Sequence, residues 1–397
     1  MIAPALNSFL MSLLTDAAGP AVPPPPEDLA QWESLIEDAE AEGLTQLLSG
    51  WLHALPERRR TFAAAVELIR PILVKIAAQN LVLAEELSSL LRRFQDHRLP
   101  CIPIRGPALA EQLYGDVTAR AMGDLDLLVP RDRLPEIAGL LTDAGYREID
   151  RRPGFARTFS YTLEFVKKRH GWIYVEPHWT IAYPPVADRI DMDSVWQRAV
   201  PGHVAGVNTL LLNRTDLLLH LCFHLLHKRE QAPLLWWREL ALLIRQEPAA
   251  IDWAQVLRMA KQTGQGELLA ETLGQVRALF RSPVPEPVLA QLAVQPEQTS
   301  RNFLRRRLAP LLRGDSCVDG RESLAQLLVL KGFPAKWRYA CGILFPSSEF
   351  MRAHYGLTGR PWLGYHYAAR LLHLLWEGGK GLAELALRPS SRQSSLR

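Results

Sequence analysis

The sequence lacks the features that identify secreted and membrane-spanning proteins. Only four cysteines are present, namely Cys101, Cys222, Cys317 and Cys341. They lie far apart and form no CxxC pair, which argues against a disulfide framework or a zinc ribbon. No run of about 18 uncharged apolar residues suggests a transmembrane span. The apolar residues 1–19 have no preceding basic region and are predicted to be a helix, not a signal peptide. We therefore expect a reduced protein in the cytoplasm.

An excess of charge of one sign is also missing. The chain has 46 basic and 42 acidic residues, a formal net charge of +4. This balance disfavours a protein that coats DNA, whose affinity would depend on concentrated lysine and arginine. The clusters Arg58–Arg60 and Arg305–Arg307 are interpreted as solvated helix faces. With 397 residues, 48% of them hydrophobic, the chain is long enough for two or three domains.

Apolar periodicity and proline or glycine punctuation predict most of the secondary structure. The proline run 23–26 is expected to be extended, and Asp216 is expected to cap the helix that follows it. The other predicted elements are helices at Pro71–His97, Pro107–Tyr114 and Arg131–Ala144, and strands at Leu99–Ile104, Asp124–Val129, Phe159–Phe165 and Gly171–Glu176, with a basic turn at 167–170 between the last two.

This order of elements predicts the α+β class (mixed α/β). We expect a small mixed sheet flanked by helices in a chain that is helix-rich overall. The predicted regions are an N-terminal helical region at 1–97, a catalytic core at 98–212, a C-terminal helical domain at 213–385 and a disordered tail at 386–397.

Two aspartates one residue apart mark the predicted strand at 124–129. Because side chains alternate along a strand, Asp124 and Asp126 share one face, while Leu125 points to the other. Clustered carboxylates repel one another and favour a bound cation. Glu176, in a second apolar stretch, could complete a site for Mg²⁺, either as a metal ligand or as the base for an attacking hydroxyl. The alternative is that the Asp-x-Asp pair is a solvated strand end.

The residues before this strand could hold phosphates. Gly106 precedes the predicted helix that begins at Pro107, and free N–H groups together with the helix dipole favour an anion there. Arg105 and Arg120 are candidate phosphate contacts because guanidinium groups pair well with phosphate oxygens. The glycine turn, Arg120, the aspartate pair and the later glutamate are together typical of phosphoryl or nucleotidyl transfer.

The segment RGPALAEQLYGDVTARAMGDLDLLVP at 105–130 resembles the poorly characterised bacterial nucleotidyltransferase family of the polymerase-β-like nucleotidyltransferase superfamily. The segments EPHW at 176–179, HLCFHLLHK at 220–228 and LFPSSEFMRAHYG at 344–356 are also similar to that family, so the resemblance extends over most of residues 70–376. The chain differs from the broader superfamily at two points. The loop reads Arg105-Gly106-Pro107 where Gly-Ser is usual, and Glu176 replaces the commoner aspartate.

The resemblance implies a polymerase-β-like core, Mg²⁺ (or alternatively Mn²⁺) and an NTP donor. It implies that Asp124, Asp126 and Glu176 are the metal ligands and catalytic carboxylates, and that Gly106 is the loop glycine. The expected reaction transfers an NMP group from an NTP to a hydroxyl-bearing acceptor and releases pyrophosphate. The acceptor could be a small molecule, a peptide or protein, or a nucleic acid. The alternatives are a non-catalytic nucleotide-binding protein on a decayed transferase core and, as the lesser one, a glycosyltransferase that uses the Asp-x-Asp pair.

Several histidines and tryptophans could belong to a site or to the core. His178 shares a strand face with Glu176 and is a candidate for contacting nucleotide or metal, or for a structural hydrogen bond. His220, His224 and His227 lie on one helix face, but the outer two are about 10 Å apart along the axis. Packing against the core, or toward the nucleotide, is therefore favoured over a shared metal ion. Trp337 is expected in the core.

Overall fold

The computed structural model describes residues 8–15, 24–54, 56–150, 155–183, 186–228, 231–294, 327, 332–354 and 363–387. The chain divides into two compact units. The first unit contains residues 1–148 and 164–295, and the second contains residues 149–163 and 296–397. The predicted boundaries at residues 97 and 212 stay a prediction.

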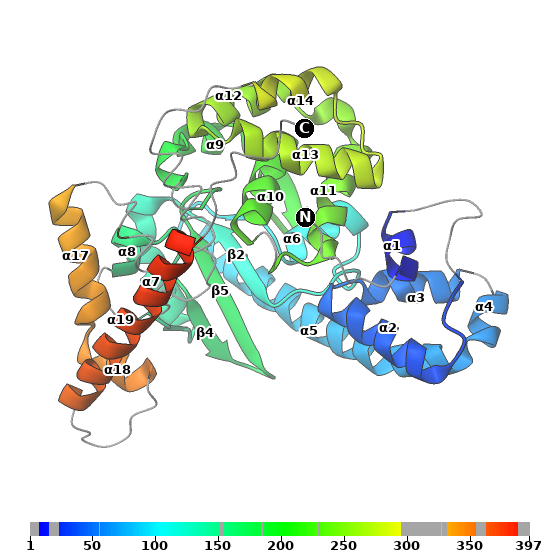
Figure 1. The fold of residues 1–397 in the computed structure, drawn as a ribbon, viewed down its shortest axis with the longest axis horizontal. Coiled ribbons are helices and arrows are strands. Elements are labelled where there is room, and N and C mark those ends of the chain that lie inside the picture. Colours follow the sequence, from blue (N-terminus) through cyan, green and yellow to red (C-terminus); the bar gives the residue numbers. More distant parts are fainter. Residues whose placement is uncertain are drawn as a thin grey trace. The chain divides into compact units, whose positions relative to one another are not determined.

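The first unit is built around a mixed sheet of five strands with the order β1-β2-β5-β4-β3 (Figure 1). The β2–β5 pair is parallel, and the other pairs are antiparallel. The strands are β1 (Ile102–Pro103), β2 (Asp124–Leu128), β3 (Arg147–Glu148), β4 (Phe165–Lys168) and β5 (Trp172–His178). A separate hairpin pairs β6 (Val200–Val204) with β7 (Val207–Leu211). The predicted α+β class, a small mixed sheet in a helix-rich chain, is confirmed.

Helices make up most of the first unit. None of the described helices combines the length and apolar character needed to cross a membrane. The helices of the first unit are α1 (Ser8–Leu14), α2 (Leu29–Ala41), α3 (Thr45–His53), α4 (Pro56–Thr61), α5 (Ala63–Asp96), α6 (Pro107–Tyr114), α7 (Leu134–Asp143), α9 (Met192–Gln197), α10 (Arg214–Lys228), α11 (Leu234–Gln246), α12 (Trp253–Thr263), α13 (Gly266–Phe280) and α14 (Glu286–Ala293).

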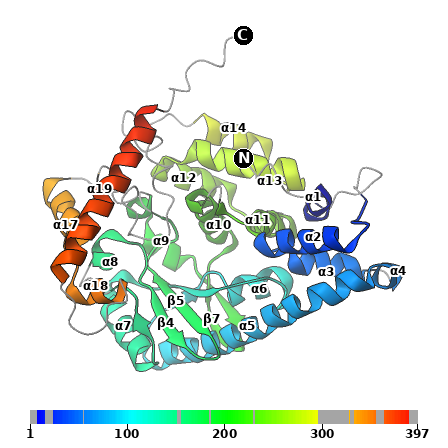
Figure 2. The same ribbon diagram turned by 60° about the horizontal axis from the view of Figure 1, so that its bottom comes forward.

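The long helix α5 covers the sheet face opposite the aspartates. Figure 2 shows it running beneath the strands. Its Glu86 carboxylate is buried and accepts hydrogen bonds from Tyr146 at 2.9 Å and from Arg169 at 3.0 Å, and it also pairs with Lys167 of β4. Apolar residues of β2 and β5 on this face, such as Leu125 and Ile173, are buried. One sheet face is therefore closed by a helix.

Helix α5 begins earlier than the sequence predicts. The expectation that Pro71 starts it is wrong, because the helix extends from Ala63 and contains Pro71 in its interior. A proline inside a helix removes one backbone hydrogen bond, and here it lies on an exposed face. Val66 and Ile69 are buried on the other face. Burial of that apolar face offsets the lost bond.

The predicted strand at Phe159–Phe165 is also wrong. Residues Phe155–Phe159 form helix α8 in the second unit, and strand β4 begins only at Phe165. The reason is an aromatic cluster in which Phe155 and Phe159, four residues apart, pack their rings 5.6 Å and 5.1 Å from Tyr339. A spacing of four residues places two rings on one face of a helix, whereas in a strand they would lie about 13 Å apart.

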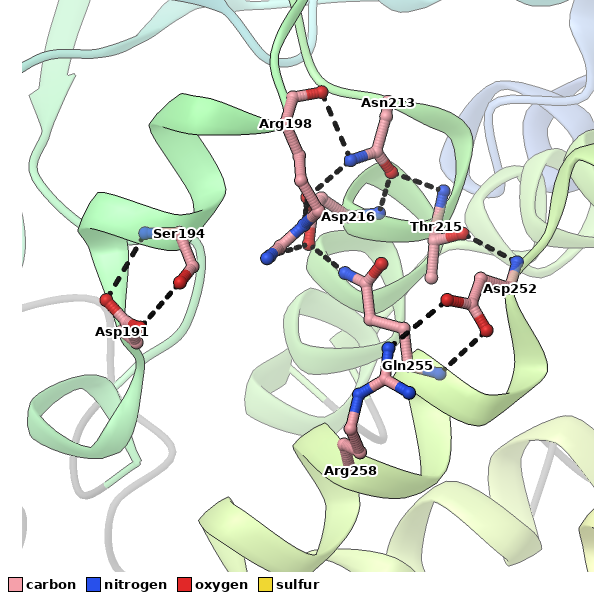
Figure 3. Close-up of polar contacts among 9 residues, drawn as sticks. All are labelled: Asp191, Ser194, Arg198, Asn213, Thr215, Asp216, Asp252, Gln255 and Arg258. Atoms are coloured by element: carbon pink, nitrogen blue, oxygen red, sulfur yellow. Dashed lines mark hydrogen bonds and ion pairs between the residues drawn. The ribbon is translucent and has the colours of Figure 1, made fainter.

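The start of α10 is held by a buried polar network, drawn in Figure 3. The predicted cap, Asp216, lies inside the helix. Asn213 takes that role because its side-chain oxygen accepts from the backbone N–H groups of Thr215 and Asp216 at 2.9 Å each. The Asp216 carboxylate instead receives two hydrogen bonds from Arg198 at 2.9 Å and one from Gln255 at 2.7 Å. This network fixes the helix that carries His220 and His224.

The second unit is helical in its described residues. It contains α8 together with α17 (Phe333–Leu344), α18 (Ser348–His354) and α19 (Leu363–Leu387). Its core joins Phe155, Tyr339, Ile343 and Leu374. The expectation that Trp337 is a core residue is wrong, because its side chain is 62% exposed. Most of the predicted tail, from residue 388 onward, lies outside the described residues.

Candidate functional site

Strand pairing brings the predicted acidic residues together. In the parallel pair of β2 and β5, Asp126 lies opposite Glu176, and Asp124 lies opposite Tyr174. Residues directly opposite one another point to the same face of a sheet. His178, two residues after Glu176, lies on this face too. We call it the site face, and it is the face opposite α5.

Asp126 is the centre of the site. Its carboxylate is buried, and its Oδ1 accepts from Arg105 Nη2 at 2.8 Å and from His178 Nε2 at 2.9 Å. The same His178 nitrogen lies 3.5 Å from Glu176 Oε2. The second oxygen of Asp126, Oδ2, is buried and has no hydrogen-bond partner among the described residues. A buried carboxylate oxygen without a donor is costly unless a cation or water completes it.

The residues present fit a metal ion. Asp126, Glu176 and His178 each offer one ligand atom, and these atoms lie within 4.8 Å of one another. Two carboxylates and an imidazole are a donor set that divalent cations accept. Asp124 is not one of these three residues, and its role as a metal ligand stays a prediction. Asp124 lies two residues earlier on the same face of β2.

The charges of the site act on one another. Asp126 and burial together raise the pKa of Asp124 to about 7. Burial would raise the pKa of Asp126 too, but Arg105 and His178 outweigh it and hold that pKa well below its usual range. Burial disfavours the charged form of His178, yet its bonds to Asp126 and Glu176 raise its pKa to about 9. Asp126 therefore carries the permanent negative charge of the pair.

The loop before α6 lies directly against β2. Gly106 has φ +58°, and a Cβ on it would lie 3.0 Å from the backbone oxygen of Asp124. Only glycine meets both conditions without strain. Pro107 occupies the first turn of α6, as the sequence predicts. The start of this helix is therefore held beside the aspartate strand.

Arg120, a predicted phosphate contact, is buried. Its Nε lies 2.5 Å from Glu239 Oε1 on α11, and its Nη1 donates to the backbone oxygen of Gly106 at 3.5 Å. Asn80 of α5 donates to the Arg120 carbonyl at 2.6 Å. In this structure Arg120 thus connects the Gly106 loop to α11. Glu239 was not anticipated, because no local pattern distinguishes it from a surface glutamate.

Arg105 is held by His224 of α10, and His224 is in turn held by Tyr183, which lies in the loop after β5. Arg105 Nη1 donates to the ring of His224, and the Tyr183 hydroxyl bonds to Nδ1 of the same ring at 2.6 Å. A neutral imidazole has one acceptor nitrogen, so when Nε2 accepts from Arg105 the Nδ1–H donates to Tyr183. Burial and the Arg105 charge hold the pKa of His224 well below its usual range. Tyr183 carries no sequence signal for this role.

The other two histidines of α10 also pack against the residues around Tyr183. His220 Nδ1 lies 2.9 Å from the carbonyl oxygen of Ile181, and the His227 ring stacks on Tyr183 with ring centres 4.3 Å apart. Burial lowers the pKa of each to about 3. These contacts correspond to the packing role that their spacing favours.

Comparison with known proteins places the chain in a family. The family model described as "Uncharacterised nucleotidyltransferase" matches residues 28–281, which is more than half of the chain and contains the whole site face. The chain belongs to this nucleotidyltransferase family. Searches of curated proteins and of solved structures found no match.

Proposed function

We propose that this nucleotidyltransferase transfers an NMP group from an NTP to a hydroxyl-bearing acceptor, with release of pyrophosphate. The observation that carries the proposal is the group of Asp126, Glu176 and His178 beside the Gly106 loop, in a chain of this family. Mg²⁺ is the proposed cation, with Mn²⁺ as the alternative. We also propose a cytoplasmic location, which the free Cys101, Cys222 and Cys341 favour.

Asp126, Glu176 and His178 would hold the cation, with Asp124 as the neighbouring carboxylate. Since only a neutral imidazole binds a metal, the cation would displace a proton from His178. When bound, the cation would neutralise charge on the transferred phosphate and orient it. Glu176 has a side chain that is 26% exposed, whereas Asp126 is fully enclosed. Glu176 is therefore the carboxylate best placed to accept the proton of an incoming hydroxyl.

The donor phosphates would bind at the start of α6. Backbone N–H groups after Gly106 and the positive end of the helix favour an anion there. Arg105, which His224 orients, would contact these phosphates from the Asp126 side. Arg120 would act through the loop, since it holds the Gly106 carbonyl and is itself paired with Glu239.

The test is the fate of an α-labelled NTP. The purified chain is incubated with each NTP in turn, Mg²⁺ and a cell extract that supplies acceptors, and both released pyrophosphate and labelled product are measured. We expect label transfer with equimolar pyrophosphate, and loss of both in Asp126→Asn. Pyrophosphate release unchanged in Asp126→Asn would contradict the proposal, and so would the absence of release with every NTP.

A second candidate is a nucleotide-binding protein without turnover. It is favoured by one observation, that Arg105 and His178 already neutralise the Asp126 carboxylate from within the protein. For this candidate, calorimetry would detect ATP binding while no pyrophosphate appears. Transfer of a labelled sugar from a nucleotide-sugar would instead support a glycosyltransferase.

A further inference from the structure

Strand β5 carries two large aromatic side chains that are open to solvent. Trp172 is 55% exposed and Tyr174 is 41% exposed. They lie on the central strand of the sheet, where apolar side chains are normally covered by the layers above and below. Their neighbours on the opposite face, Ile173 and Val175, are buried. Two adjacent exposed rings at such a position indicate a surface that binds a flat or apolar group.

These rings point to the same face as the carboxylates. Every second residue of β5 points to the site face, namely Trp172, Tyr174, Glu176 and His178. Tyr174 lies directly opposite Asp124 of β2. Exposure falls steadily along this row, from 55% at Trp172 to 1% at His178. The row therefore extends from solvent to the proposed metal ligands Glu176 and His178. A molecule that lies over the two rings would contact the carboxylates with the end that is nearer to Glu176.

Basic side chains lie beside the rings. Lys168 pairs with Trp172 across β4 and β5, with its ammonium 5.6 Å from the ring centre. Arg147 lies opposite Val166, which in turn lies opposite Tyr174, so all three share the site face. Arg147 and Lys168 are both exposed. This combination of rings and exposed cations suits a planar ring that carries negative charge.

The rings lie on the side of β2 away from the Gly106 loop. The Gly106 loop packs on β2 at the backbone of Asp124, and it follows β1, the strand on one side of β2. Strands β5 and β4, with Trp172 and Lys168, lie on the other side. A donor held at Gly106 and a molecule held on the rings would therefore approach the carboxylates from opposite sides. This is the arrangement that transfer between two substrates requires.

We propose that Trp172 and Tyr174 form a stacking platform for the base of an acceptor mononucleotide, with Lys168 and Arg147 binding its phosphate. The identity of this molecule as the acceptor rests on the function proposed above. Every nucleobase presents a flat face to an aromatic ring, and the two cations distinguish a nucleotide from a neutral sugar. Two rings and two cations match one nucleotide better than a long single strand of nucleic acid, which needs a continuous basic groove.

The test uses AMP as the probe and the full chain as the protein. Calorimetric titration is performed in α,β-methylene-ATP, which fills the donor site without being cleaved. We expect Trp172→Leu and Tyr174→Leu each to weaken AMP binding about tenfold or more. Trp337→Leu, which removes a 62% exposed tryptophan of the second unit, should leave binding unchanged. Lys168→Gln should weaken AMP binding but not adenosine binding.

Several results would overturn this inference. The first is that the wild type and both ring variants bind AMP with equal affinity. The second is that the wild type does not bind AMP at all. The third is that it binds an adenine oligonucleotide but not AMP. If the wild type forms a dimer that Trp172→Leu dissociates, the face belongs to a second copy of the chain. If AMP binds through the rings but no NTP yields pyrophosphate, the platform is retained and the transferase function fails.

Discussion

The guanidinium of Arg105 donates to Asp126 Oδ1 at 2.8 Å and thereby joins the loop before α6 to strand β2. His224 binds Arg105 from the other side, and Tyr183 bonds to the ring of His224. The two aspartates of β2 are consequently not equivalent. Asp126 is paired inside the protein, whereas Asp124 shares the face, has no ion pair with another described residue and is repelled by its neighbour. Substitution should separate their contributions to folding and to catalysis.

Asp126→Asn should both inactivate and destabilise the protein. We expect turnover to fall at least about 100-fold, because the proposed cation would lose a ligand. We also expect the free energy of unfolding to fall by about 3 kcal/mol, since Arg105 would lose its buried counter-charge. Asp124→Asn should reduce turnover similarly but change stability by less than about 1 kcal/mol, because it relieves repulsion.

Urea unfolding and pyrophosphate release measure the two effects, and Asp143→Asn at the exposed end of α7 is the control. Equal stability of Asp126→Asn and Asp143→Asn would show that the Arg105 pair contributes nothing to folding.

Gly106→Ala should destabilise the first unit. The positive φ and the contact 3.0 Å from the Asp124 oxygen predict a loss of about 1–3 kcal/mol in the free energy of unfolding. Gly139→Ala is a matched control, because Gly139 lies in helix α7 with nothing within 4 Å of its added Cβ. That variant should gain up to about 1 kcal/mol. Equal effects of the two substitutions in urea unfolding would contradict the conformation described for the loop.

Glu86→Gln should weaken the attachment of α5 to the sheet. The Glu86 side chain is 3% exposed and pairs with Lys167 and Arg169, so removing its charge should cost about 3–5 kcal/mol. Glu85→Gln, one residue earlier and 64% exposed, should cost less than about 1 kcal/mol. Thermal and urea unfolding measure the difference. If both variants unfold alike, the contacts of Glu86 do not stabilise the fold.

The buried histidines of α10 should make the fold sensitive to acid. Burial lowers the pKa of His220 to about 3, whereas in the unfolded chain an unperturbed histidine titrates near about 6.5. Between these values the unfolded state binds more protons, so this histidine's contribution to stability decreases as the pH falls. Removing it in His220→Gln should reduce the pH slope of the unfolding free energy by up to about 1.4 kcal/mol per pH unit.

Urea unfolding between pH 4 and pH 7, about the range in which histidine titrates, measures this slope. His203→Gln, which changes an exposed histidine, is the control variant. An identical slope in His220→Gln and the wild type would mean that His220 titrates normally in the folded protein.

Much of the site could be predicted from the sequence because it depends on local patterns. The period of two in a strand places Asp124 with Asp126, and Glu176 with His178, on common faces. Proline at position 107 marks the first turn of α6. The period of 3.6 in a helix places the three histidines of α10 on one side. Each of these inferences needs only residues close together in the chain.

The wrong predictions concern segments whose structure depends on contacts with residues far away in the chain. Tyr339 packs against Phe155 and Phe159, so Phe159, the predicted start of a strand, ends helix α8 instead. Buried apolar residues extend α5 through Pro71. Arg120 could not be assigned to Glu239, because 119 residues separate them. A strongly apolar or charged residue can be expected to need a partner when it is buried, but the sequence does not identify that partner.

Residues close together in the chain are enough to predict which side chains share a face of each element and where the Gly106 turn begins. The opposition of Asp126 and Glu176, the addition of His178 and the link from Asp126 through Arg105 to His224 all depend on how distant segments pack. Alternation along a strand or helix is local geometry. Strand register and buried ion pairs depend instead on the free energy of packing segments that are far apart in the chain.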